Sequence, residues 1–110
     1  MLLKPPRTAQ FPTTRVEASL RGWIEDQAAR QGRTPSNLAR LLLSRARLPD
    51  ALDPAADARS LKSAVLPALV VDAEVFARYA MRAAELKVPI SALVRHVLWE
   101  ATANDEELLP

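Results

Sequence analysis

Hydrophobic and polar positions alternate over a short stretch near the start of this chain. In residues 13–17, Thr14 and Val16 fall on one side. Thr13 and Arg15 fall on the other. This period of two is that of a β-strand, in which successive side chains point to opposite faces. Because so short a strand is not stable alone, the pattern predicts that it pairs with a second strand of the chain.

The hydrophobic period then changes to that of a helix. Residues 18–31 carry the apolar stripe Leu20, Ile24 and Ala28 at a spacing of four, which predicts an amphipathic helix. Gly32 follows the stripe. Glycine adopts the left-handed conformation that ends helices, so the first helix is expected to stop there.

A second helix is predicted over residues 33–47. Thr34 is a strong N-cap residue, and Pro35 stands at the first helical position, where its missing N–H group costs nothing. The helical spacing continues beyond this start. The residues expected on the buried face are Leu38, Leu41 and Leu42.

The whole pattern occurs twice. A shift of 55 positions places residues 13–46 on residues 68–101 without a gap. Self-similarity at a fixed period indicates a repeated structural unit. The second copy is expected to have a strand at 68–72 and helices at 73–87 and 89–103. Matching pairs include Val16 and Val71, Ala28 and Ala83, Ser36 and Ser91, Leu38 and Leu93, Arg40 and Arg95, and Leu43 and Leu98.

The repeat predicts the organisation of the chain. Two copies bury apolar faces that a single copy leaves open, so one compact domain is expected. Its predicted parts are a flexible arm at 1–12, the first copy at 13–47, a linker at 48–67, the second copy at 68–103 and an acidic tail at 104–110.

Composition narrows the classes of function. The chain has no Cys and one His, which excludes thiolate metal sites and argues against a histidine site. With two Gly and no catalytic motif, no enzyme activity, metal or cofactor is expected. No signal peptide or membrane span is visible, so a cytoplasmic protein without membrane contact is expected. Residues 1–50 hold nine basic and four acidic residues, whereas residues 51–110 hold six basic and nine acidic residues. A polyanionic partner is therefore expected to bind the first half.

The order of strand, helix, turn and helix resembles the ribbon-helix-helix (MetJ/Arc) superfamily of DNA-binding proteins. The turn is Gly32-Arg33-Thr34-Pro35-Ser36. The duplication resembles the tandem, single-chain members that assist plasmid conjugation and DNA transfer. The resemblance implies a mainly α fold with a two-stranded antiparallel ribbon, formed by two tandem repeats as a single-chain pseudo-dimer.

The resemblance also implies a double-stranded DNA partner and the residues that contact it. The ribbon would enter the major groove, with Phe11 at its edge. The start of the second helix would bind a backbone phosphate. The residues implied to contact bases are Thr13 and Arg15. Those implied to contact phosphates are Arg33, Thr34, Ser36 and, in the second copy, Ser91.

Two functions are consistent with this reading. The first is a transcriptional regulator or a relaxosome-type DNA-transfer accessory factor, associated with nucleoid or plasmid. The alternative is a protein-interaction module, an antitoxin-like partner or assembly adaptor, because the second strand has the apolar outward residues Ala68 and Val70 and the tail ends EELLP. Two chains side by side on DNA, a protein partner bound through the acidic tail and an obligate dimer also remain open.

Overall fold

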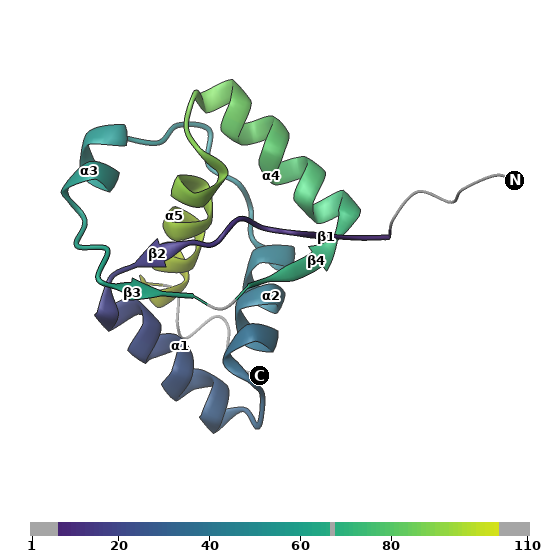
Figure 1. The fold of residues 1–110 in the computed structure, drawn as a ribbon, viewed down its shortest axis with the longest axis vertical. Coiled ribbons are helices and arrows are strands. Elements are labelled where there is room, and N and C mark those ends of the chain that lie inside the picture. The colour runs from purple at the N-terminus through teal and green to yellow at the C-terminus, as the bar shows by residue number, and fades with distance from the viewer. Residues whose placement is uncertain (1–6, 67, 104–110) are drawn as a thin grey trace, which may run out of the picture.

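The computed structural model describes residues 7–66 and 68–103 as a mainly helical fold with short antiparallel strand pairs, which confirms the predicted fold class at this level (Figure 1). The predicted acidic tail at 104–110 and the first six residues of the predicted arm lie outside this part. The elements in chain order are β1 (Thr8–Gln10), β2 (Arg15–Val16), α1 (Ala18–Arg30), α2 (Pro35–Arg45), α3 (Pro54–Arg59), β3 (Ala64–Val65), β4 (Val70–Asp72), α4 (Ala73–Leu86) and α5 (Ile90–Ala103).

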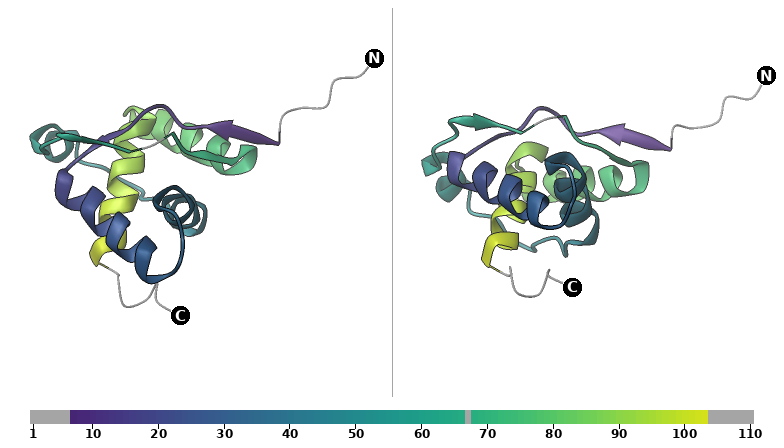
Figure 2. Two further views of the ribbon diagram at one scale, coloured as in Figure 1. Left: turned by 60° about the horizontal axis from the view of Figure 1, so that its bottom comes forward. Right: turned by 90° about the horizontal axis from the view of Figure 1, so that it is seen from below.

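The four strands form the two ends of a single narrow ribbon. β1 pairs antiparallel with β4, with Ala9 opposite Val71. β2 pairs antiparallel with β3, with Val16 opposite Ala64. The register is the same in both pairs. β1 and β2 thus form one edge of the ribbon, called the first strand here, and β3 and β4 form the other edge, called the second strand. In both views of Figure 2 this ribbon lies along one side of the helices.

Backbone hydrogen bonds continue the ribbon between its two ends. The N–H of Phe11 donates to the carbonyl of Leu69 at 2.9 Å. The N–H of Leu66 donates to the carbonyl of Thr14, also at 2.9 Å. Pro12 has no N–H group, so regular strand pairing is interrupted around it.

Side chains from the inner face of the ribbon and from four of the helices form one hydrophobic core. Tyr79 is fully buried, and its hydroxyl donates to the carbonyl of Leu43 at 2.6 Å, as a buried hydroxyl requires. The Phe11 ring meets the Tyr79 ring edge to face, with centroids 5.2 Å apart. The other large members of the core are Val16, Leu20, Ile24, Leu38, Leu42, Leu43, Leu66, Leu69, Val71, Leu93, Val94, Val97 and Leu98.

The first helix of each copy ends in the same backbone conformation. Gly32 has φ 67° after α1, as predicted, and Lys87 has φ 59° after α4. Each end has the backbone bonds of a Schellman motif, which satisfies carbonyls of the last turn. The bonds that span the motif run from the N–H of Arg33 to the carbonyl of Ala28 and from the N–H of Val88 to the carbonyl of Ala83.

Lys87 has a side chain in a conformation that favours glycine. A Lys87→Gly variant is therefore expected to gain about 0.5–1 kcal/mol of stability in urea unfolding. Gly32→Ala is the matched control and is expected to lose a similar amount. Its added Cβ meets no atom within 4 Å, so only the positive φ opposes it. An unchanged unfolding midpoint for Lys87→Gly would contradict this account.

The prediction of a flexible arm at residues 1–12 is wrong for the residues that the structure describes. Thr8–Gln10 form β1. Phe11 is 1% exposed within the core, so it does not lie at the edge of the ribbon. The prolines of this stretch exclude a helix, but they permit an extended strand, and β4 supplies its partner.

The predicted boundaries between copies and linker are also wrong. Within the expected linker at 48–67, β3 pairs with β2 and so belongs to the ribbon. The residues that face the core change phase between Phe11 and Thr14, where two exposed residues lie between two buried ones. A simple alternation of period two therefore breaks at this point. For this reason the alternation predicted only the half of each strand that follows the break.

Candidate nucleic-acid interface

The outer face of the ribbon is a row of exposed side chains of mixed chemistry. The first strand contributes hydrogen-bonding groups from Thr8, Gln10, Thr13 and Arg15, all of them exposed. The second strand contributes Val65, Ala68 and Val70, and the two valines are 39% and 41% exposed. Every second residue of a strand faces the same way, so the strand pairing brings these groups onto one surface. The structure thus places both predicted base-contacting residues, Thr13 and Arg15, on this surface.

The backbone of Arg15 is held in place by a hydrogen bond, whereas its side chain is exposed and unpaired among the described residues. Its carbonyl accepts a hydrogen bond from Nη1 of Arg95 at 3.0 Å, which ties β2 to α5. Its guanidinium has no hydrogen bond or ion pair with any residue that the structure describes. A rigid backbone with an unpaired fork of donors is suited to bidentate recognition of an acceptor outside the chain.

The sequence pattern did not predict Gln10 as a site residue. It lies on β1, opposite Val70, in the same exposed row as Arg15. The signal that could have found it is the repeat itself. The shift of 55 positions continues upstream of residue 13, where it places Phe11 on Leu66 and Pro12 on Pro67.

The start of α2 lies beside the ribbon and carries the predicted phosphate-contacting residues. Oγ1 of Thr34 accepts from the N–H of Asn37 at 3.1 Å, so Thr34 caps the helix as predicted. Arg33 is exposed, and its Nε donates to Oε1 of Gln31 at 3.2 Å. Ser36 is half-buried in the first turn. A capped helix start of this kind favours an anion through its dipole and its free N–H groups.

A groove of about 420 Å³ separates α2 from the β1–β4 end of the ribbon. Arg40, which was not predicted as a site residue, is exposed there and has no ion pair or hydrogen bond among the described residues. The groove is thus open to solvent and contains two arginines against one carboxylate. Its polar lining consists of Thr8, Arg33, Asn37, Arg40, Ser44 and Asp72.

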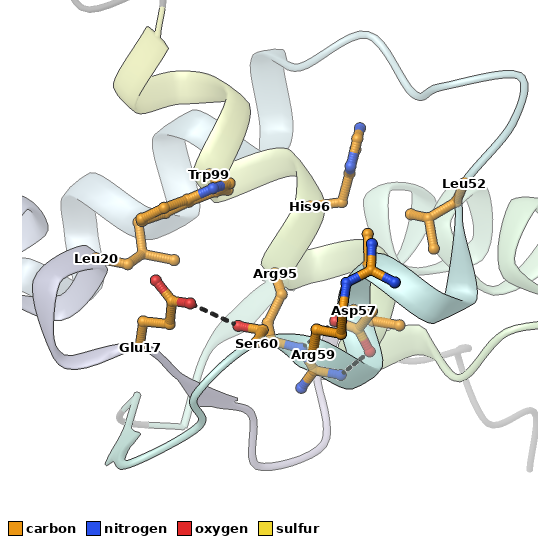
Figure 3. A pocket seen from close by; sticks show the side chains of 11 residues that line it. Glu17, Leu20, Leu52, Asp57, Arg59, Ser60, Arg95, His96 and Trp99 are labelled. Atoms are coloured by element: carbon orange, nitrogen blue, oxygen red, sulfur yellow. Dashed lines mark hydrogen bonds and ion pairs between the residues drawn. The ribbon is translucent and has the colours of Figure 1, made fainter.

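The other end of the ribbon has a second pocket, of about 270 Å³, whose wall on α5 corresponds to the groove beside α2 (Figure 3). The 55-residue shift relates the two walls by taking Asn37 to Ala92, Arg40 to Arg95, Leu41 to His96 and Ser44 to Trp99. Here α3 forms the opposite wall with Ala56 and Asp57.

Asp57 binds Arg95 across this second pocket. Its two carboxylate oxygens accept from Nε and Nη2 of Arg95 at 2.7 and 2.8 Å. The side chains of Arg95 and Asp57 are only 12% and 22% exposed. The hydrogen bonds from Arg95 lower the pKa of Asp57, against the opposing effect of burial, so this carboxylate is charged at neutral pH.

Ser91 lies half-buried in the first turn of α5. The residue before this helix is Pro89, which has no side-chain acceptor to cap it and stands at the position of Thr34 in the first copy. The helix start is held instead by backbone bonds from Ala92 and Leu93 to the Pro89 carbonyl. The predicted second phosphate clamp therefore lacks the cap that orders the first one.

Two further findings bear on the class of protein. Within residues 7–66 and 68–103, no helix has the length and apolar character needed to cross a bilayer. No protein-family model, curated protein or solved structure matches this chain.

Proposed function

We propose that this chain is a single-chain ribbon-helix-helix protein that binds double-stranded DNA through the outer face of its ribbon. It would serve as a transcriptional regulator or as an accessory factor in DNA transfer. The observation that carries the proposal is the hydrogen-bond pattern across the ribbon, which supports an approximate two-fold relation between the two copies.

The two-fold relation follows from the backbone hydrogen bonds that cross the ribbon. The N–H of Phe11 donates to the Leu69 carbonyl, and the N–H of Leu66 donates to the Thr14 carbonyl. The 55-residue shift relates Phe11 to Leu66 and Thr14 to Leu69. Exchanging the two copies therefore turns one hydrogen bond into the other. A dimer of one-copy chains has this relation by symmetry. Finding it within one chain supports two copies joined end to end.

The chemistry of the ribbon supports DNA as the partner. A two-stranded β-ribbon fits the major groove, where base edges are read. A free arginine can donate two bonds to guanine, and a glutamine can bind adenine in the same bidentate manner. Arg15 and Gln10 both project from the first strand. Val65 and Val70 offer methyl groups that can contact thymine.

The first test measures binding of wild type and Arg15→Ala to mixed-sequence duplex DNA by fluorescence anisotropy over a salt series. Wild-type affinity is expected to fall steeply with salt, because phosphate neutralisation releases counterions. Arg15→Ala is expected to bind severalfold more weakly, because the ribbon loses its arginine contact with the duplex.

The matched control for this experiment is Arg30→Ala. Arg30 is exposed at the end of α1 far from the ribbon, where it pairs with Asp26 at 3.1 Å (Figure 1). Its loss also removes one positive charge, but affinity is expected to change less than twofold. Absence of wild-type binding at low salt would reject DNA as the partner. Equal weakening by both substitutions would mean that net charge, and not the ribbon, drives binding.

A further inference from the structure

We propose that the chain contacts the DNA backbone on one flank of the ribbon only. The groove beside α2 receives the phosphate, whereas Asp57 of the chain itself occupies the corresponding position at α5. This inference rests on the proposed function. It adds that only the flank beside α2 binds the DNA backbone, whereas the flank beside α5 is closed.

The first argument compares two arginines at equivalent positions of the repeat. Arg40 is exposed and has no partner among the described residues. Arg95 is mostly buried and binds both carboxylate oxygens of Asp57. A guanidinium binds carboxylate and phosphate with the same planar, two-bond geometry. Asp57 therefore satisfies at Arg95 the donors that a phosphate would need, and Arg40 keeps its donors free.

The second argument is that α3 and the chain after it block the second flank. Asp57 holds α3 against α5, and Ser60 donates from its hydroxyl to Glu17 at 3.2 Å (Figure 3). The N–H of Leu61 donates to the same Glu17 oxygen at 3.4 Å. The segment is thus fastened on both sides of the pocket. With Arg59 and Arg95 in its lining, this pocket has two arginines and the carboxylates of Glu17 and Asp57, so it offers a phosphate less net positive charge than the groove beside α2, which has two arginines and one carboxylate.

The third argument is the loss of polar groups along the second flank. At four positions where the first copy has groups able to hold a phosphate, the second has an apolar residue or a proline, whereas Ser91 keeps the serine of Ser36. Apolar side chains supply neither the charge nor the hydrogen-bond donors that phosphate contacts require. The replacements are Val88 for Arg33, Pro89 for Thr34, Ala92 for Asn37 and Trp99 for Ser44.

The equivalent arginines give a matched test. In the anisotropy salt series, Arg40→Gln is expected to weaken DNA binding severalfold and to lower the slope of log K against log salt by about one, the value of one phosphate contact. Arg95→Gln is expected to leave this slope unchanged, because Arg95 contacts no phosphate, even where affinity falls through loss of its hydrogen bond to the Arg15 carbonyl. Equal losses of slope in the two variants, with folding checked by circular dichroism, would overturn the proposal.

A second measurement needs no variant and so does not depend on the folding of Arg95→Gln. Backbone amide shifts of the wild-type chain are recorded by NMR during titration with a short duplex. The amides of residues 33–40 are expected to move, and those of residues 90–95 to stay near their free positions. Shifts of similar size at both helix starts would overturn the one-flank proposal alone. No binding by wild type would reject the proposed function and this inference with it.

Discussion

Replacing Phe11 by Ala is expected to lower the free energy of unfolding by about 3–5 kcal/mol, the usual cost of removing a fully buried aromatic ring. Phe11 is 1% exposed, and its ring contacts those of Phe76 and Tyr79 at centroid distances of 5.5 and 5.2 Å. The truncation leaves a cavity under the middle of the ribbon and removes apolar surface that joins the first strand to α4. Urea unfolding followed by circular dichroism measures the loss.

Gln10→Ala is the matched control for Phe11→Ala. Gln10 is the preceding residue on the same strand, but its side chain is exposed on the outer face. Its truncation is expected to change stability by about 0.5 kcal/mol or less. A Phe11→Ala variant as stable as wild type would mean that the segment before residue 13 is a loose arm in solution and that β1 does not contribute to the fold.

The second large effect concerns alkaline pH. Burial raises the pKa of the Tyr79 hydroxyl well above its ordinary value, although the charge of Arg78 opposes the shift slightly. The unfolded chain loses this proton from about pH 10, and the folded chain does not. The stability that the neutral phenol contributes is therefore complete below about pH 10. It then falls by about 1.4 kcal/mol per pH unit as pH rises toward the folded-state pKa.

Tyrosinate absorbance tests this prediction directly, because Tyr79 is the only tyrosine of the chain. The absorbance is expected to appear together with the loss of helical circular dichroism, and not before it. Tyr79→Phe is the control for the pH effect. It is expected to lose about 1–3 kcal/mol at neutral pH, because the Leu43 carbonyl loses its buried donor, and to show a weaker decline of stability above pH 10. Tyrosinate formation near pH 10 in the folded protein would contradict the burial of the hydroxyl.

Under the proposed one-flank binding, the chain would lie on DNA in one direction. A symmetric ribbon would bind a palindrome equally well in both directions. In the proposed complex, the polar residues of the outer face lie on the first strand, and the groove proposed to bind phosphate lies beside the start of α2 alone. Such a chain is expected to prefer a non-palindromic site and to bind it in a single orientation.

The sequence by itself determined the local features of both copies. The predicted first helix at 18–31 is found as α1 at Ala18–Arg30, with Gly32 in the left-handed conformation after it. Thr34 caps α2 as predicted. Thr14 and Val16 face the core, and Thr13 and Arg15 face solvent. These features were predictable because helix period, strand alternation and capping depend on residues within a few positions of one another.

Only the tertiary structure decided which distant segments meet. β1 pairs with β4, and β2 pairs with β3, although the sequence pattern showed only half of each strand. No local pattern links Asp57 to Arg95, which lies 38 positions away. Whether that arginine faces solvent or a carboxylate depends on where α3 packs, which long-range contacts determine. The repeat therefore predicted two similar halves, and the packing of α3 against α5 pairs Arg95 with Asp57, whereas Arg40 stays exposed.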